Sequence, residues 1–125
     1  MKLGNMSVPG DCERISPILG IVGNKWTVLV VLVLSAGPLR YNQMRREIES
    51  ISQRMLTVTL RGLERDGMVW RRVTGDRNLP QVEYGLTPLG HSLVQPLYTL
   101  CHWSAHHVDE IEASRRKFAA QDADA

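Results

Sequence analysis

Cationic and hydrogen-bonding side chains recur on one side of a segment in the middle of the chain. Over residues 51–67 they are spaced three or four positions apart, which gathers side chains on one face of an α-helix. They are Gln53, Arg54, Thr57, Arg61 and Arg65. Arginine and amide side chains make paired hydrogen bonds to base edges and phosphates. The pattern predicts a face that contacts double-stranded DNA; the alternative is an ordinary solvated helix face.

The same segment has an apolar face, which must be buried if the polar face is to be held in place. Its members recur at helical spacing and are Ile51, Met55, Leu56, Leu60 and Leu63. Ser52 is a favourable N-cap, and Gly67 is a favourable stop just after the last turn. We therefore predict a helix between these two residues, with one side in the core and the other toward DNA.

Arginines cluster around this predicted helix. Residues 40–77 contain nine arginines and no lysine, against five acidic residues. This segment has a net charge of +4, so the remainder of the chain, whose total is +2, carries −2. Arginine forms bidentate bonds to guanine and phosphate that lysine cannot form. We predict that Arg45 and Arg46, on the preceding helix, contact phosphates.

A β-hairpin is predicted directly after this helix. Residues 68–73 and 81–86 alternate as strands do, whereas residues 74–80 are rich in Gly, Asp, Asn and Pro and favour a loop. A helix followed by a hairpin is the order of a winged helix-turn-helix. Arg72 on the hairpin and Arg77 at its tip are predicted to reach phosphates or the narrow minor groove. The alternative for the tip is a mobile, solvated loop.

The elements that must position these groups fit one domain of 125 residues. We expect a flexible N-terminal arm over 1–11, a single domain over 12–118 and a frayed tail over 119–125. Further elements are expected as helices or short extended segments. They are helices over 12–22, 25–35, 42–48 and 87–117, and an extended lead-in over 39–41. The fold class is mainly α with a small β-hairpin.

Neither the first ten residues nor the longest apolar run predicts a signal peptide or a membrane span. The first ten residues lack the apolar stretch of a signal peptide. The apolar run over 28–34 is far shorter than the roughly 20 residues of a membrane span. We therefore expect a cytoplasmic protein with no membrane partner.

The long C-terminal helix predicts a homodimer, because its apolar stripe extends beyond what a compact winged domain can cover. The first helix is expected to contribute to the same interface. The residues expected there are Ile15, Ile18, Leu93, Leu97, Leu100, Trp103, Val108 and Ile111. A two-fold dimer also suits DNA, because it places two reading helices about one turn, roughly 34 Å, apart.

Two cysteines are too few for a disulfide framework, which is typical of a reducing compartment. Cys12 is the candidate redox sensor, because a helix N-terminus and Arg14 favour its thiolate, although Asp11 and Glu13 oppose it. The alternative is a small apolar side chain in the dimer seam. Cys101 lies on the apolar stripe and is expected to be buried. An intersubunit disulfide between Cys12 and Cys101 would require Cα atoms within about 7 Å.

The remaining side chains predict neither catalysis nor a cofactor. The sequence has no Gly-rich phosphate loop, nucleophile motif or apolar carboxylate pair, so we do not expect an enzyme. His102 and His106 are one helical turn apart, which can suit a metal ion, but no distant further ligand is apparent and we expect no bound metal. Trp26, Tyr98 and Trp103 line a plausible effector cleft or are simply aromatic core; any effector is unknown.

Taken together, these segments resemble the HxlR family of bacterial winged helix-turn-helix transcriptional regulators, relatives of the MarR group. The resemblance covers residues 12 to about 108 in order. It is carried by Cys12 and by the segments 19–27 (with Gly23-Asn24-Lys25-Trp26), 39–48, 51–57, 60–67, 82–90 and 100–103. It implies a dimer that binds operator DNA through the helix after Ser52, with the wing at the flanking minor groove. It also implies that Cys12 matches the sensing cysteine of some members of the family. This chain has Glu13 after that cysteine, whereas the family more commonly has Pro at that position.

We therefore predict a sequence-specific regulator of transcription that binds double-stranded operator DNA, as a repressor and with oxidant or electrophile sensing through Cys12. Two alternatives remain open from the sequence. One is a winged-helix module that contacts protein, which would show apolar residues on the reading face. The other is a regulator that responds to a metal ion or a small molecule.

Overall fold

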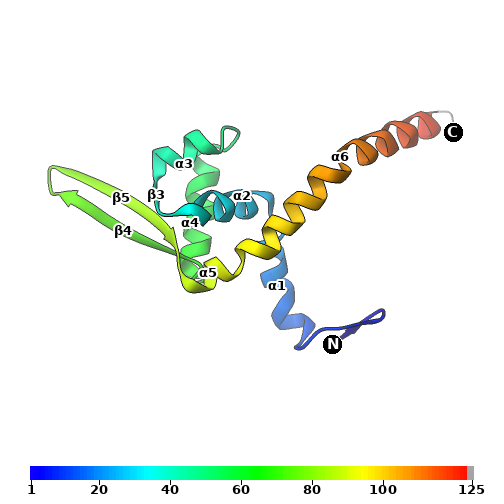
Figure 1. Ribbon diagram of the computed structural model, residues 1–125, viewed down its shortest axis with the longest axis horizontal. Helices are drawn as coiled ribbons and strands as arrows, with labels where there is room; N and C mark the ends of the chain where they lie inside the picture. The colour runs from blue at the N-terminus through cyan, green and yellow to red at the C-terminus, as the bar shows by residue number, and fades with distance from the viewer. Residues whose placement is uncertain (124–125) are drawn as a thin grey trace.

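The computed structural model describes residues 1–123. Its β4–β5 hairpin and its long helix α6 extend from opposite sides of a small helical body (Figure 1). The helices are α1 (Cys12–Val22), α2 (Lys25–Val33) with the 3₁₀ turn η1 (Leu34–Ala36), α3 (Tyr41–Glu47), α4 (Gln53–Arg65), α5 (Pro88–Ser92) and α6 (Val94–Ala123). The strands are β1 (Lys2–Leu3), β2 (Met6–Ser7), β3 (Leu39–Arg40), β4 (Val69–Asp76) and β5 (Leu79–Leu86). The predicted fold class, mainly α with a small hairpin, is confirmed.

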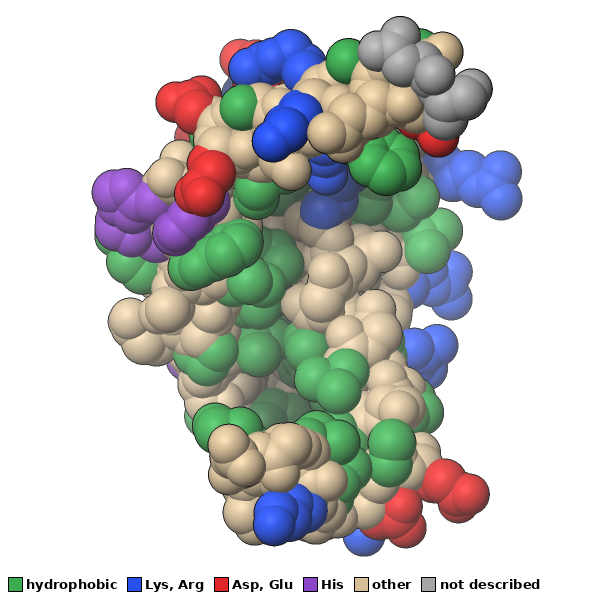
Figure 2. Space-filling view, turned by 90° about the vertical axis from the view of Figure 1, so that its right-hand side faces the viewer, with side chains coloured by type: hydrophobic (Ala, Val, Ile, Leu, Met, Phe, Trp, Pro, Cys, Tyr) green, Lys and Arg blue, Asp and Glu red, His purple; other side chains and the backbone are tan. Residues whose placement is uncertain are grey.

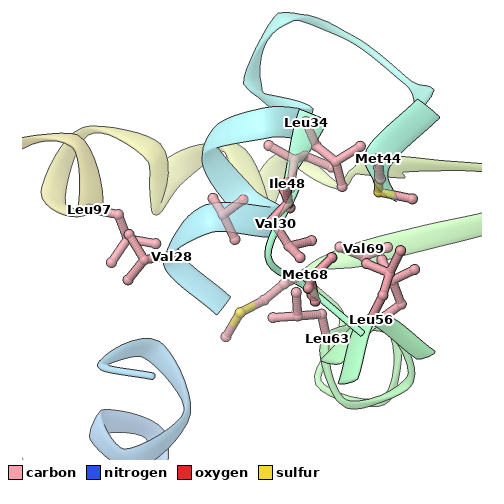
Figure 3. Packing of buried hydrophobic residues seen from close by; sticks show 14 residues of the cluster. Val28, Val30, Leu34, Met44, Ile48, Leu56, Leu63, Met68, Val69 and Leu97 are labelled. Carbon is pink, nitrogen blue, oxygen red and sulfur yellow. The ribbon is translucent and has the colours of Figure 1, made fainter. Parts of the chain in front are cut away.

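Helix α2 lies at the centre of the core because it is apolar nearly all round. Its Val30 and Val31 are completely buried, and Leu34 follows them in η1. Helices α3 and α4 and the base of the hairpin add Met44, Leu56 and other apolar side chains around it (Figure 3). The core therefore sits directly behind α4 and fixes where its outer face points.

Both predicted ends of α4 are confirmed. The Ser52 hydroxyl accepts a hydrogen bond from the Met55 backbone N–H at 3.0 Å, as an N-cap should. Gly67 has φ +78°, a left-handed conformation that stops the helix, and the Met68 N–H then donates to the Leu63 carbonyl at 2.9 Å. These local signals set the length of α4 and hence the span of its polar face.

The sheet is antiparallel with strand order β3–β5–β4, so the short β3 joins the hairpin to the start of α3. The predicted hairpin is present, but the predicted loop over 74–80 is wrong. Both strands continue to the pair Asp76–Leu79, which leaves only Arg77 and Asn78 at the tip. The Asp76 carboxylate closes this turn by accepting from the backbone N–H groups of Asn78 and Leu79, each at 2.9 Å. Cross-strand pairing therefore outweighs the loop-favouring composition of residues 74–80.

Helices α2 and α3 differ in detail from the prediction. Helix α2 ends at Val33 and continues as the 3₁₀ turn η1, so the expected helix over 25–35 changes character near its end. Helix α3 begins at Tyr41, and Asn42 is therefore not its cap. Instead, the Gln43 side chain accepts a hydrogen bond from the Arg40 backbone N–H at 2.8 Å. The side chain that caps the N-terminus of α3 therefore comes from the first turn of α3 itself.

The predicted single helix over 87–117 is interrupted. Thr87 caps α5 as expected, with its hydroxyl accepting from the Gly90 N–H at 3.1 Å, but α5 ends at Ser92 and α6 begins at Val94. Pro96 explains the break, because it has no N–H to donate to the Ser92 carbonyl and its ring crowds that carbonyl. Helix α6 then continues to Ala123, so the tail expected over 119–125 is helical as far as Ala123; residues 124–125 lie outside the described part.

The N-terminal arm is also more ordered than predicted. Strands β1 and β2 pair as a small antiparallel hairpin, and the Val8 N–H donates to the Met1 carbonyl at 2.8 Å. Within residues 1–123, no single helix is long and apolar enough to cross a membrane. The segment 12–22 together with 25–36 meets that test only as a pair bent by 66°. Helix α2, within this pair, forms the centre of the core.

Candidate nucleic-acid interface

The outward face of α4 presents the predicted DNA-contacting side chains together. Gln53, Arg54, Thr57 and Arg61 are all exposed, whereas Leu56, Leu60 and Leu63 on the inner face are each no more than 1% exposed. Gln53 and Arg54 lie in the first turn, which is the end of a reading helix that enters the major groove. This arrangement provides hydrogen-bond donors on a helix whose other face is anchored in the core.

Tyr41 connects α3 to the first turns of α4, a contact that the sequence did not indicate. Its hydroxyl donates to the Gln53 backbone carbonyl at 2.8 Å and lies 3.0 Å from the Thr57 hydroxyl. Because one phenolic proton serves the carbonyl, the Thr57 hydroxyl is the donor in the second bond. Thr57 is therefore partly engaged within the protein, and Tyr41 ties the first turns of α4 to α3.

A polar cleft of about 290 Å³ separates α4 from the hairpin and is lined by Thr57, Arg61, Glu64, Arg71 and Tyr84. The Arg71 Nε lies 3.8 Å from a Glu64 carboxylate oxygen. Burial raises the pKa of Tyr84, and the nearby Arg71 partly opposes that rise. Arg71 belongs to the basic segment 40–77, but the sequence does not predict it as a site residue. Its pairing with Tyr84 across β4 and β5 places it in the lining of the same cleft as Arg61.

The last turn of α3 carries Arg45 and Arg46, both exposed as predicted for phosphate contacts. Arg46 also lines a second cleft, of about 470 Å³, between the start of α3 and the hairpin. Arg40 and Gln81 contribute to the same cleft. Arg40 is thus a further cation on this side of the molecule, which only the pairing of β3 with β5 could reveal.

The hairpin carries its two predicted arginines in different environments. Arg72 Nη2 donates to a Glu83 carboxylate oxygen at 2.9 Å, and its guanidinium lies 4.7 Å from the centre of the Trp70 ring. Arg77 is exposed at the two-residue tip. Arg72 must therefore exchange or share its partner to contact a phosphate, whereas Arg77 is at the position that reaches farthest from the body.

The model of the HxlR-like helix-turn-helix family matches residues 21–112, which include α2 to α5, the hairpin and most of the exposed polar face. The chain belongs to the HxlR-like helix-turn-helix family. The resemblance drawn from the sequence is thereby confirmed, as is its consequence that the protein is a transcriptional regulator with a helix-turn-helix. The family consists of DNA-binding regulators of transcription.

Individual relatives cover most of the chain. It is 42% identical over 111 residues to an uncharacterized HTH-type transcriptional regulator of Methanothermobacter thermautotrophicus, which spans 86% of this chain and 84% of that one. The reduced form of the redox regulator HypR is 36% identical, with a TM-score of 0.71, over 80% of this chain and 98% of HypR. The putative regulator YtfH from Salmonella typhimurium is 31% identical, with a TM-score of 0.73, over 91% and 99%. These likenesses confirm the winged-helix fold.

Both cysteines of this HxlR-like protein are exposed free thiols. Cys12 is the first residue of α1, where Asp11 caps the helix by accepting from the Glu13 N–H at 3.0 Å. Its sulfur lies 3.6 Å from the Ser16 hydroxyl. The expectation that Cys101 is buried is wrong for the single chain: among residues 1–123, those that bury Leu97 do not cover Cys101 one turn further along α6.

The residues predicted for a dimer interface divide into two groups. Ile18, Leu100, Trp103 and Val108 are exposed, and Ile15, Leu93 and Ile111 are partly exposed. Leu97 is the exception, since it packs beside Val28 of α2 and is only 4% exposed (Figure 3). Its assignment to the interface is therefore corrected: Leu97 attaches the start of α6 to the core. Tyr98 and Trp103 are both exposed, so the aromatic-core alternative for them is wrong within the single chain.

Proposed function

We propose that this HxlR-like regulator is a sequence-specific repressor that binds operator DNA as a homodimer in the cytoplasm, where bacterial and archaeal DNA lies. The observation that carries the proposal is the pair Gln53 and Arg54, exposed on the first turn of a helix whose opposite face is fully buried. Base edges in the major groove are read by such amide and guanidinium groups on a helix of fixed orientation.

The cations outside α4 position the protein on the duplex rather than read bases. Arg61 extends the reading face of α4, with Thr57 between it and the first turn. Arg45 and Arg46 contact phosphates beside the groove, and Arg77 at the hairpin tip contacts the flanking backbone or minor groove. Arg72 supports this wing through its pair with Glu83 and its contact with Trp70.

Homodimer formation rests on the apolar side chains that α1 and α6 leave exposed. Leu100, Trp103 and Val108 are about half exposed in the single chain, and exposed apolar groups in a row mark an association surface. A two-fold dimer presents two α4 helices to successive major grooves, which fits an operator with two half-sites about one helical turn apart.

The test is a binding titration of the untagged protein on the DNA upstream of its own gene, with a scrambled duplex of equal length as control. At physiological salt and with reduced thiols, we expect the native duplex to bind at least about a thousandfold more tightly, the lower end of specific recognition. Equal, weak, salt-sensitive binding to both duplexes would contradict sequence reading on this DNA and favour a protein-contact module. Reporter expression with and without the protein then separates repression from activation.

Redox control through Cys12 is the second part of the proposal. HypR, a structural neighbour with 36% identity, is named as a redox regulator and is known in oxidized and reduced forms. Here the Cys12 thiol lies exposed at the start of α1, where an oxidant can reach it. In the dimer, loss of two protons and two electrons would join Cys12 to Cys101 of the second copy, with diamide as the electron acceptor reduced to its hydrazine.

The experiment is a non-reducing gel and an operator titration after diamide treatment, using wild type, Cys12→Ser and Cys101→Ser. We expect a covalent dimer and altered operator affinity in wild type only. A response that persists in Cys12→Ser would overturn the role of Cys12. A response that survives Cys101→Ser but not Cys12→Ser would overturn the disulfide between the two cysteines.

A further inference from the structure

Helix α6 carries a column of aromatic and imidazole rings that the proposed DNA-binding function does not use. Tyr98, His102 and His106 follow one another at successive turns. The Tyr98 and His102 rings have centres 5.8 Å apart, and the His102 and His106 rings have centres 4.3 Å apart with planes at 70°. Both imidazoles are exposed. Histidine side chains gather at one edge of the molecule (Figure 2).

This column lies away from the apolar stripe of the same helix. Because successive residues turn by 100° around a helix, His102 and His106 lie on the side roughly opposite the buried Leu97. Leu100, Cys101 and Val108 fall on the Leu97 side. A second copy of the chain docked on the stripe would therefore leave the two imidazoles open to solvent.

The spacing of the two rings suits one metal ion. Zinc–imidazole bonds are about 2.1 Å long, so two rings that bind one ion at 90–110° have centres roughly 4.5–5 Å apart. The observed separation of 4.3 Å is close to this, and the rings are free at the surface to turn their nitrogens inward. The backbone of α6 need not move for His102 and His106 to share an ion.

His107, although next in sequence, is in a different situation. Its ring stacks on Trp103, with centres 4.4 Å apart and planes at 20°. Its Nδ1 lies 2.7 Å from the Trp103 carbonyl oxygen. His107 therefore points to another side of α6 and has one ring nitrogen engaged, which makes it a matched control on the same turn of helix.

We propose that His102 and His106 form a two-ligand chelate for a divalent transition-metal ion. Within residues 1–123, no group of three or more His, Cys, Asp or Glu side chains is placed to hold a metal ion, so water completes the coordination shell. Such an open shell differs from a structural zinc site, which has four protein ligands. Imidazole ligands select Cu²⁺, Ni²⁺ and Zn²⁺ over Mg²⁺ and Ca²⁺, with Cu²⁺ bound most tightly.

The bound ion would tie one turn of α6 to the next. Beyond Leu97, the side chains of α6 are mostly exposed in the single chain, and the helix projects from the body (Figure 1). A helical segment without tertiary packing is only marginally stable in water. An ion that binds the helical arrangement and not the frayed one stabilises it by mass action. This inference does not depend on the proposed operator binding.

The experiment is a calorimetric titration of NiCl₂ into the untagged full-length chain in a Cys12→Ser, Cys101→Ser background, which removes competing thiols. We expect one ion per chain. We also expect His102→Ala or His106→Ala to weaken binding at least about tenfold, the lower end of what loss of even an outer-shell partner causes. His107→Ala should leave the affinity unchanged. Far-ultraviolet circular dichroism of each variant verifies that the fold is retained.

Several outcomes would overturn the chelate. Equal weakening by His107→Ala, or retention of full affinity in the His102→Ala, His106→Ala double variant, would place the ion elsewhere. Competition by an equal concentration of MgCl₂ would indicate a carboxylate site rather than an imidazole site. A measured stoichiometry of one ion for every two chains would show that two copies of the chain share the ion. It would contradict a site on one chain whose coordination shell is completed by water.

Discussion

Helices α4 and α6 both carry apolar stripes, but their surroundings differ. On α4, Leu56, Leu60 and Leu63 are each no more than 1% exposed, because α2 and the hairpin base surround them. On α6 only Leu97 is buried to a similar degree, whereas Leu100 and Trp103 are 48% and 54% exposed. The position of α4 is thus set within one chain, whereas α6 has an apolar face that its own chain leaves open.

This difference matches the two tasks proposed for these helices, DNA reading for α4 and dimer formation for α6. A reading helix must be rigid relative to the rest of the domain, because base contacts require fixed geometry. Caps at Ser52 and Gly67, a buried face and the Tyr41 hydroxyl bond together provide that rigidity in α4. An association helix must instead keep its apolar face available. The contrast predicts that substitutions in the two stripes act on different measurable properties.

The largest effect is expected from Leu60→Ala in α4. The side chain is 1% exposed, and removing a buried leucine destabilises a domain by about 2–5 kcal/mol through lost burial and the cavity that remains. Urea unfolding monitored by circular dichroism measures the change. Val58→Ala, on the exposed side of the same helix, is the matched control and should shift stability by no more than about 0.5 kcal/mol. Similar shifts for both variants would contradict the burial of the inner face.

The next effect is expected from Trp103→Ala in α6, and it should appear in association rather than folding. Aromatic residues are enriched among interface hot spots, and truncating a hot-spot residue costs about 2 kcal/mol or more, which corresponds to roughly a 30-fold rise in the dimer dissociation constant. Sedimentation equilibrium measures that constant. Tyr98→Ala, equally exposed but off the apolar stripe, should leave it unchanged. A monomeric wild type at all concentrations, or equal effects of both variants, would contradict the proposed dimer face.

Arg54→Ala should reduce discrimination between operator and scrambled DNA by about 1–3 kcal/mol, the contribution of one bidentate base contact. Its matched control is Arg116→Ala, an exposed arginine on α6 that lies far along the association helix. That variant should leave discrimination unaltered. If Arg54→Ala weakened binding to both duplexes by the same factor, Arg54 would be a phosphate contact, and base reading would have to come from other residues of α4.

Local sequence signals predicted the elements whose ends depend on nearby residues. Ser52 and Gly67 define α4 through capping and a left-handed stop, and Thr87 defines the start of α5. The exposed polar face of α4 followed from the same helical spacing. These features could be predicted because each depends on residues within one or two turns.

Features that depend on distant partners could not be predicted in the same way. The strands extend to Asp76 and Leu79 because they pair with each other, although the composition there favours a loop. Arg71 lines the same cleft as Arg61 only through the register of β4 with β5. Cys101 is exposed because, within residues 1–123, the packing that buries Leu97 does not extend one turn further along α6. Pro96 lies inside the predicted helix over 87–117, but the end of α5 that it explains falls four residues earlier, at Ser92.

The smallest expected effect concerns Tyr41, whose contacts also join distant residues. Tyr41→Phe removes the bonds to the Gln53 carbonyl and the Thr57 hydroxyl and should lower the free energy of unfolding by about 0.5–1.5 kcal/mol. Because both freed groups are exposed to water, we expect the lower part of that range. Urea unfolding of Tyr41→Phe, Thr57→Val and the double variant measures how much of the effect the two side chains share.

If Tyr41 also holds the reading end of α4 for DNA, Tyr41→Phe must weaken operator binding more than it weakens binding to the scrambled duplex. A loss of stability with unchanged discrimination would mean that the buried face of α4 alone fixes its orientation. Additive effects of Tyr41→Phe and Thr57→Val on unfolding would likewise contradict their direct coupling. Either result would assign the rigidity of α4 to the leucines behind it, and the contrast with α6 would then rest on burial alone.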